Sequence, residues 1–300
     1  MKITVIGAGA IGLLFSARLF SAGHKVQLIA RQKDQSERIN QAGITVFSEK
    51  GEEKMMVPSE TGLSCLKESD CAVITVKQHQ LESLLSAINS IPVTTPIIFT
   101  QNGMGHLELL ENLPHEHLFV STVEHGAEKL SSNEVRHNGI GTWRIASFKG
   151  DLSLVFQLNK KDDSLFPVDF HSDYYLLLGK KLIKNILINS LTSLFEVKNG
   201  ELIRNPYLNK LLHTLYHETL EIFPHMKEIV TVKEVERLCA ATASNQSSMR
   251  KDLLLKRQTE KEAIIGFALR EATKKNITAP LLQFLYDGIS AKEFGEGIRH

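Results

Sequence analysis

The sequence predicts an α/β fold, in which an N-terminal doubly wound parallel sheet is followed by an all-helical C-terminal domain. Over the first half of the chain, short buried-strand patterns alternate with helical stretches, which is typical of βαβ units. From about residue 170 onwards the apolar residues recur with a helical period instead. We therefore expect a first domain over residues 1–169 and a helical second domain over residues 170–300.

The first βαβ unit has a glycine pattern at its turn. Gly7, Gly9 and Gly12 lie between a strand expected over residues 3–6 and a helix expected over residues 11–22. In such a unit the first glycine allows a tight turn, the second lets the backbone approach a pyrophosphate, and the third lets the helix press on the strand. The N–H groups of the helix N-terminus then face the anion. This context predicts a Rossmann-type dinucleotide site rather than a plain glycine-rich turn.

The end of the second strand, expected over residues 25–30, predicts which dinucleotide binds. An NAD-binding unit normally has Asp or Glu there, roughly 20 residues past the glycines, for the ribose 2′-hydroxyl. This chain has Arg31, followed by Gln32 and Lys33, and its first acid is Asp34. Because a guanidinium can hold a phosphate through two parallel hydrogen bonds, we expect NADP(H) rather than NAD. The alternative is a solvated surface arginine.

Three further buried strands are expected over residues 72–76, 97–100 and 118–123. Lys77 follows the first of them, and an NGMG segment that begins at Asn102 follows the second. Open α/β sheets bind ligands at the C-terminal edge of their strands, so both positions are site candidates. The alternatives are an ordinary surface charge for the lysine and a simple turn for NGMG.

The end of the first domain is less clear from the sequence. Gly139, Gly141 and the alternating residues 142–145 predict a β-hairpin that closes the domain. Residues 152–170 have no assignable secondary structure, except that the KKDDS tract at 160–164 is expected to be a solvated loop.

One helix of the second domain, expected within residues 180–194, carries a polar stripe on an otherwise apolar surface. At about 100° per residue, Lys181, Asn185 and Asn189 share one narrow face that isoleucine and leucine side chains border. Burying an unpaired amide costs about 1 to 3 kcal/mol, and an unpaired charge costs more, so these groups need partners. The partners could be an interhelical hydrogen-bond network or a ligand. The other two lysines of the segment fall elsewhere on the helix and are not candidates.

Composition limits the classes of partner. The 300 residues, 42% of them hydrophobic, can form two cores of ordinary size. With 35 basic and 34 acidic residues and no apolar run near the ~18 residues of a membrane span, we expect no nucleic-acid or membrane partner. Three cysteines and twelve histidines lack metal-ligand spacing, so we expect no metal, reduced cysteines and a cytoplasmic protein. Glycines interrupt the first apolar run, so we expect no signal peptide.

Seven motifs are spread in order along the whole chain. They are GAGAIG at 7–12, TVKQHQ at 75–80, QNGMG at 101–105, GKKLIKNILINSLT at 179–192, KNGEL at 198–202, NQSSM at 245–249 and QTE at 258–260. Together they resemble the 2-dehydropantoate 2-reductase, or ketopantoate reductase, family. The resemblance implies NADPH-dependent reduction of 2-dehydropantoate to (R)-pantoate, a step toward pantothenate and coenzyme A. We also expect a small-molecule 2-keto acid substrate and a monomer or homodimer.

The resemblance also implies roles for individual residues. Lys181 would be the proton donor to the substrate carbonyl, with Glu260 as the partner of the substrate hydroxyl and of the lysine. The substrate-binding positions would be Asn102, Asn185, Asn189, Asn245 and Ser248. The cofactor-binding positions would be Gly7, Ala8, Gly9, Ala10, Ile11, Gly12, Arg31, Lys77, Asn102 and Glu260. A hydride that reaches C2 of a 2-keto acid leaves an alkoxide, which a nearby ammonium can protonate.

Two of these assignments have ordinary structural alternatives. Thr259 and Glu262 have the spacing of a capping box, in which Glu260 would only stabilise the first helical turn. Ser247 and Ser248 could both bond their own backbone, and the choice of Ser248 comes from the resemblance alone.

Two positions depart from the family pattern. Ser190 stands where relatives often have Pro, which affects only local helix geometry, and Ile265 stands where some have Asn, which could remove a polar contact near the substrate. One alternative function is therefore a related NADP-dependent reductase of another branched 2-keto acid. A non-enzymatic NADP-binding sensor is the other alternative, although a sensor has no need of the lysine and asparagine stripe.

Overall fold

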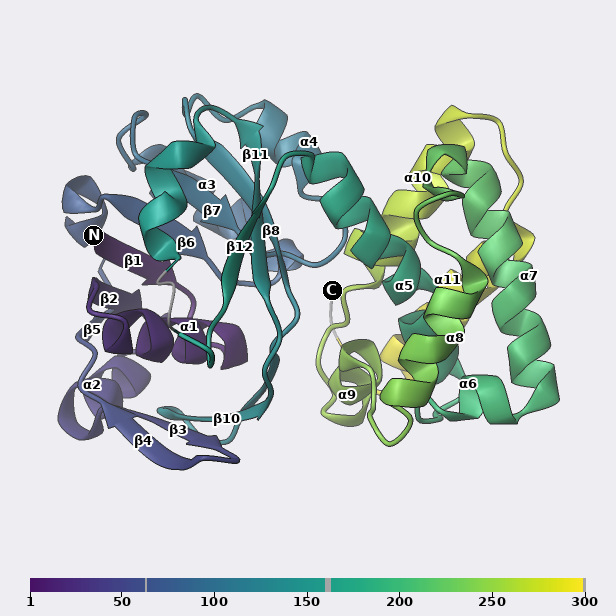
Figure 1. The fold of residues 1–300 in the computed structure, drawn as a ribbon, viewed down its shortest axis with the longest axis horizontal. Helices are drawn as coiled ribbons and strands as arrows, with labels where there is room; N and C mark the ends of the chain where they lie inside the picture. The colour runs from purple at the N-terminus through teal and green to yellow at the C-terminus, as the bar shows by residue number, and fades with distance from the viewer. Residues whose placement is uncertain (63, 160–162, 299–300) are drawn as a thin grey trace. The chain divides into compact units, whose positions relative to one another are not determined.

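The computed structural model describes residues 1–300 except 63, 160–162 and 299–300 (Figure 1). The chain folds into two compact units. The first unit comprises residues 1–101 and 108–177, and the second comprises residues 102–107 and 178–300. A short loop from the sequence of the first unit thus belongs to the second.

The first unit is built around an eight-stranded sheet with the order β12-β11-β8-β7-β6-β1-β2-β5. Every neighbouring pair is parallel except β8 with β11, which is antiparallel. The predicted doubly wound parallel sheet is confirmed. Its strands are β1 (Lys2–Ile6), β2 (Lys25–Ile29), β5 (Ser59–Glu60), β6 (Cys71–Ile74), β7 (Ile97–Phe99), β8 (Leu118–Val123), β11 (Trp143–Lys149) and β12 (Val168–His171).

The central strands are apolar on both faces because helices cover the sheet on both sides, as parallel sheets require. The helices of this part of the chain are α1 (Ala10–Ser21), α2 (Lys33–Ala42), α3 (Leu85–Asn89) and α4 (Leu107–Glu111). In the core, the ring of Phe15 on α1 lies 4.6 Å from that of Trp143 and 4.9 Å from that of Phe166, centroid to centroid. The first helix is thereby fixed against the sheet.

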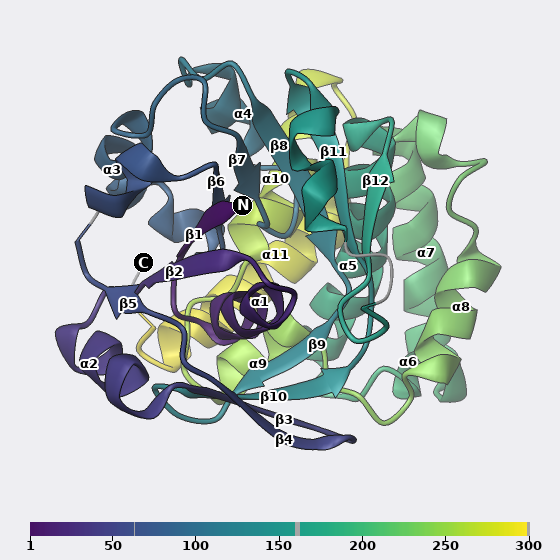
Figure 2. The same ribbon diagram turned by 60° about the vertical axis from the view of Figure 1, so that its left-hand side comes forward.

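A second, four-stranded sheet lies beside α1 (Figure 2). It has the order β4-β3-β10-β9. Its strands are β3 (Ile44–Ser48), β4 (Gly51–Met55), β9 (Gly126–Lys129) and β10 (Glu134–Gly139).

The predicted hairpin around residues 139–145 is wrong. The strands β10 and β11 belong to different sheets: β10 pairs with β3 and β9, whereas β11 pairs with β8 and β12. Gly141 lies where the chain passes between the sheets, and a Cβ there would come within 2.3 Å of the Glu124 carbonyl group. Trp143, which is fully buried, then anchors β11 in the large sheet.

The segment that the sequence left unassigned contains a 3-10 helix, Leu152–Leu158, and the strand β12. Of the KKDDS tract, residues 160–162 lie outside the described residues. The Asp163 carboxylate accepts hydrogen bonds from the backbone N–H groups of Leu165 and Phe166, which forms a turn before β12.

The second unit is helical, as predicted, and none of its described residues lies in a strand. It contains most of α5 (Tyr174–Leu194), whose first four residues belong to the first unit. Its other elements are α6 (Glu201–Arg204), α7 (Pro206–Ile222), a 3-10 helix (Pro224–Met226), α8 (Val232–Ala241), α9 (Ser248–Leu254), a π-helical turn (Glu262–Gly266), α10 (Phe267–Lys274) and α11 (Pro280–Gly295). In the part of the chain that the structure describes, no helix is both long and apolar enough to cross a membrane.

Two histidines form a buried pair in the first unit. Nδ1 of His125 lies 3.0 Å from Nε2 of His137 and accepts the backbone N–H of Gly141 at 3.2 Å. Burial lowers the pKa of His125 to about 4, with smaller contributions from the neighbouring His137 ring and from the Arg18 guanidinium. Burial and the Arg18 guanidinium also lower the pKa of His137. Both rings are therefore neutral in the folded protein at neutral pH.

Because His125 and His137 are buried in the neutral form, we expect the protein to lose stability at acidic pH. The unfolded chain binds more protons than the folded chain below a histidine's ordinary pKa of about 6.5, so stability is complete above that pH and falls as the pH drops. We expect the free energy of unfolding to decrease by about 1 to 3 kcal/mol between pH 7 and pH 5, measured by urea titration. His125→Gln should reduce this loss, and Asn138→Gln at the exposed neighbouring position should not. An undiminished loss in the His125 variant would contradict the prediction.

Candidate functional site

The three glycines of the first βαβ turn have the predicted geometry. Gly7 has a φ of +113°, and a Cβ there would lie 2.8 Å from Cγ1 of Val76. A Cβ on Gly12 would lie 1.7 Å from the carbonyl oxygen of Gly7, so only glycine lets the helix approach the turn so closely. A Cβ on Gly9 would meet nothing within 4 Å, which leaves open space in front of the helix.

That open space faces the N-terminus of α1. Gly9 is the N-cap residue, no side chain caps the helix, and no acidic residue lies in its first turn. The N–H groups of the first turn are therefore available to an anion such as a pyrophosphate. The loop is held from the other side, because the Ala8 carbonyl accepts hydrogen bonds from Nε2 of Gln35 at 2.9 Å and from Nζ of Lys129 at 3.0 Å. The sequence did not reveal these two supports, which come from α2 and β9.

The register of the sheet brings the other candidate cofactor residues to the same edge. Ile6 of β1 pairs with Ile29 of β2 and with Ile74 of β6, so these three strands end level with one another. Arg31 follows β2 and is exposed, and Lys77 follows β6 and is half-buried. The glycine turn, the arginine and the lysine thus lie at the C-terminal edge of adjacent strands, where this fold binds dinucleotides.

In the second unit, α5 carries the predicted polar stripe. Asn189 is only 7% exposed and Asn185 is half-buried, as is Lys181. Among the described residues, neither asparagine side chain has a hydrogen-bond partner. An interhelical network would have satisfied these amides within the protein, and the described residues form no such network, so the amides are accessible to a ligand or to solvent.

The neighbouring lysines of α5 are engaged elsewhere. Nζ of Lys184 lies 2.7 Å and Nζ of Lys180 lies 3.5 Å from Oε1 of Glu234 on α8. Burial tends to raise the pKa of the Glu234 carboxyl, but the two ammonium groups outweigh it, and the pKa is lowered. These two lysines therefore join α5 to α8, and Lys181 is the lysine on the asparagine face.

The NGMG segment forms a turn that carries Asn102 to Glu260. Nδ2 of Asn102 donates to Oε2 of Glu260 at 2.8 Å. The turn is fixed by Gly103, whose φ is +79°, and by the N–H of Met104, which donates to the Ala263 carbonyl at 3.2 Å. NGMG is thus a turn, as predicted, and the turn also places the Asn102 side chain against Glu260.

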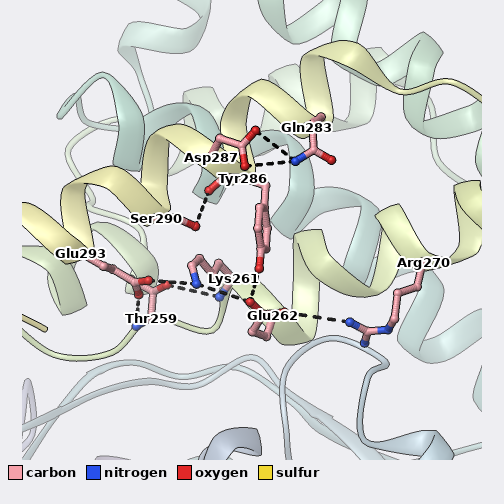
Figure 3. Close-up of polar contacts among 9 residues, drawn as sticks. All are labelled: Thr259, Lys261, Glu262, Arg270, Gln283, Tyr286, Asp287, Ser290 and Glu293. Carbon is pink, nitrogen blue, oxygen red and sulfur yellow. Dashed lines mark hydrogen bonds and ion pairs between the residues drawn. The ribbon is translucent and has the colours of Figure 1, made fainter. Parts of the chain in front are cut away.

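Glu260 is not part of a capping box. Oγ1 of Thr259 accepts the N–H of Lys261, but the Glu262 carboxylate bonds Tyr286 and Lys261 instead of the Thr259 backbone (Figure 3). The Thr259 N–H donates to Oε1 of Glu293 on α11 at 2.8 Å. The capping box therefore lacks the bond from the Glu262 side chain to the Thr259 backbone. The Glu260 side chain instead accepts a hydrogen bond from Asn102.

The two serines at the start of α9 have different environments. Ser247 caps the helix by accepting the N–H of Arg250, and it also accepts a hydrogen bond from Oγ1 of Thr192 at 2.7 Å. Ser248 and Asn245 are exposed. Because the hydroxyl of Ser247 already has both of these partners, Ser248 is the better candidate for a ligand.

Asn199, within the KNGEL motif, supports this region and was not singled out from the sequence. Its side chain donates to Oγ1 of Thr242 at 2.9 Å, and its backbone N–H donates to the carbonyl of Asn245 at 3.1 Å. It holds the loop that carries Asn245. Its place in a motif was the only signal in the sequence.

The two departures from the family pattern have simple local consequences. Ser190 continues α5, and its hydroxyl donates back to the carbonyl of Ile186. Ile265 is fully buried in the π-helical turn.

The described cysteines and potential metal ligands form neither a disulfide nor a metal site. The three cysteines are free, and burial raises the pKa of the Cys71 thiol to about 12, which keeps it unreactive. Over the described residues, no group of three or more His, Cys, Asp or Glu side chains could hold a metal ion.

A dinucleotide-binding sheet joined to a helical unit with a lysine and asparagine stripe defines a two-domain, NAD(P)-dependent oxidoreductase. Comparison with known proteins agrees. The family described as "Ketopantoate reductase PanE/ApbA" matches residues 3–150, and its C-terminal part, "Ketopantoate reductase PanE/ApbA C terminal", matches residues 175–293. The chain belongs to the ketopantoate reductase family.

Individual relatives match over nearly the whole chain. A 2-dehydropantoate 2-reductase of Bacillus subtilis is 38% identical over 298 residues, which is 98% of each chain. The crystal structure of a probable 2-dehydropantoate 2-reductase from the same species superimposes with a TM-score of 0.88 at 36% identity, covering 97% of this chain and 100% of the other. A D-mandelate dehydrogenase solved with NADH and anilino(oxo)acetate has a TM-score of 0.87 at 24% identity, covering 99% and 100%, and shares the fold.

Proposed function

We propose that the protein catalyses the NADPH-dependent reduction of 2-dehydropantoate to (R)-pantoate, in the route to pantothenate and coenzyme A. The observation that supports this most is the stripe on α5. There the amides of Asn185 and Asn189 have no partner among the described residues, while Lys180 and Lys184 are occupied by Glu234. Membership in the ketopantoate reductase family supports the same substrate.

Each group has a defined task in this proposal. NADPH, when bound, supplies a hydride to C2 of the keto acid. The ammonium of Lys181 donates a proton to the carbonyl oxygen as negative charge develops there, which completes the alcohol. Asn185 and Asn189 hold the substrate through their free amides, with Asn245 and Ser248 as further substrate contacts.

Glu260 and Asn102 act on both ligands in this proposal. The hydrogen bond between them fixes the carboxylate, which accepts from the product hydroxyl and orients the Lys181 ammonium. The glycine loop, Arg31 and Lys77 hold the dinucleotide.

We also propose the division of labour that the sequence suggests. Residues 1–169 would bind the cofactor and residues 170–300 the substrate, apart from the shared Asn102 and Glu260. Three free cysteines fit a cytoplasmic protein, which we propose as a monomer or a homodimer.

The direct test is turnover. NADPH oxidation is measured with 2-dehydropantoate and, in parallel, with other branched 2-keto acids. The highest kcat/KM with 2-dehydropantoate supports the proposal. A higher value with another keto acid would favour the second candidate, which the fully buried Ile265 motivates. Tight NADPH binding without turnover of any keto acid would favour a sensor.

Cofactor choice gives a second prediction. Arg31→Ala should raise the KM for NADPH about tenfold to 100-fold, because a charge-assisted phosphate contact contributes roughly 1.5 to 3 kcal/mol. The KM for NADH should barely change, because NADH has no 2′-phosphate. Steady-state kinetics with both cofactors measure this, with Arg204→Ala at an exposed position of α6 as the control. Equal effects on the two cofactors would mean that Arg31 does not bind the phosphate.

A further inference from the structure

A buried ion pair contacts the residues on either side of Glu260 in the sequence. Lys261 is 5% exposed and Glu293 of α11 is fully buried, and Nζ of the lysine lies 3.1 Å from Oε2 of the glutamate (Figure 3). The other oxygen of Glu293 accepts the backbone N–H of Thr259 at 2.8 Å. One carboxylate therefore holds the residue before Glu260 and the residue after it.

The segment that follows also needs support. Residues Glu262–Gly266 form a π-helical turn, a rare geometry that often occurs at functional sites. The Glu262 carboxylate bonds the Tyr286 hydroxyl of α11 and lies 4.0 Å from the guanidinium of Arg270. A Cβ on Gly266 would lie 2.7 Å from this carboxylate, so the turn and the cluster fit each other closely.

Stability alone does not explain a buried charge pair. Taking two charges out of water costs about as much as their attraction returns, and apolar residues of similar size often stabilise a fold equally well. The pair has a directional effect that apolar residues lack, because Lys261 and Thr259 are both tied to one fixed carboxylate. With both neighbours fixed, the side chain of Glu260 points toward Asn102, whose Nδ2 lies 2.8 Å from its Oε2.

We propose that Glu293 and Lys261 are positioning residues, which hold Glu260 in the orientation that the reaction needs. This inference rests on the proposed function of Glu260. In this proposal the pair acts by restricting the backbone on both sides of the glutamate. Pre-organisation of this kind affects kcat more than substrate binding, because a small misplacement of a reacting group has a large kinetic cost.

The test uses variants that keep side-chain size. Glu293→Gln retains an acceptor for the Thr259 N–H but loses the charge that faces Lys261. We expect kcat to fall about tenfold, with a KM change of less than about threefold. The double variant Lys261→Met with Glu293→Gln has no orphaned buried charge, so its melting temperature should recover while its kcat stays low. Recovery of kcat together with melting temperature would overturn the proposal.

A double-mutant cycle shows whether the effect passes through Glu260. In a Glu260→Gln background, Glu293→Gln should lower kcat no further. Independent effects that multiply would overturn the proposal. Asp287→Asn is the matched control on α11, because the Asp287 carboxylate bonds only Gln283 of the same helix among the residues that the structure describes. Its kcat should stay within twofold of wild type.

Hydrogen exchange separates this inference from the proposed function. If the wild-type protein does not reduce 2-dehydropantoate, the proposed function fails, but the positioning effect can still be measured. Glu293→Gln should accelerate amide exchange in residues 102–107, read by mass spectrometry, because Glu260 no longer holds Asn102 firmly. Unchanged exchange in this loop would overturn the positioning role even in an active enzyme.

Discussion

Replacing Lys181 with alanine should lower kcat by about 10² to 10⁴, the usual contribution of a positioned acid. Lys181 shares its helix face with two asparagines whose side chains have no hydrogen-bond partner among the described residues, and in the proposed function this face binds the substrate. The affinity for NADPH, measured by fluorescence titration, should stay near wild type, because the expected cofactor contacts lie at the sheet edge. A loss confined to kcat and kcat/KM would show an interaction made in the transition state.

Lys184→Ala is the matched control for this experiment. Its ammonium lies 2.7 Å from Glu234 and joins two helices, so the variant should lose some stability and keep its turnover within a few-fold of wild type. The reverse result, in which Lys184→Ala stops turnover and Lys181→Ala does not, would refute the assignment of the catalytic lysine.

Signals that are local in sequence predicted the first unit well. The glycine spacing at the first turn gave the conformations of Gly7 and Gly12, and β8 begins and ends at the expected residues, Leu118–Val123. The strand expected over residues 72–76 ends earlier, at Ile74. The backbone N–H of Thr75 still donates to the Ile6 carbonyl of β1 at 2.9 Å, and its hydroxyl donates to the carbonyl of Gly7 at 2.9 Å, which is a contact between distant segments.

Pairing between distant strands was the main failure. The alternating pattern after Gly141 correctly predicted a strand, but alternation carries no information about which strand it pairs with. The small sheet joins β3 and β4 from early in the chain to β9 and β10 from much later. No local pattern specifies such a pairing, since its stability comes from contacts that form only in the folded protein.

The candidate site also has a part that local sequence patterns predict and a part that they do not. Helical periodicity placed Lys181, Asn185 and Asn189 on one face, because those residues lie on one continuous helix. Two other features join segments that are far apart in the chain. One is the hydrogen bond between Asn102 and Glu260, and the other is the contact of Glu293 with the residues on either side of Glu260. The family motifs singled out Glu260 and Asn102 as candidates, but they contain no signal for the buried pair of Lys261 and Glu293.

Replacing Gly103 with alanine should have the second large effect on catalysis. At this position φ is +79°, which strains any side chain, and a Cβ would lie 2.0 Å from the carbonyl oxygen of Ala263. The clash is with backbone, so the loop of residues 102–107 must move rather than a flexible side chain. Asn102 then loses its position against Glu260.

We expect kcat/KM for 2-dehydropantoate to fall about 100-fold in Gly103→Ala, because displacement of catalytic groups by about 1 Å has a cost of that size. Circular dichroism should show a folded protein, since the strained loop is short and the helical core does not depend on it. Gly139→Ala is the control, because a Cβ there meets nothing within 4 Å, and its kinetics should match wild type. Wild-type kinetics in Gly103→Ala would show that the contact between Asn102 and Glu260 does not need this turn, and that neither residue depends on the close packing of the loop against Ala263.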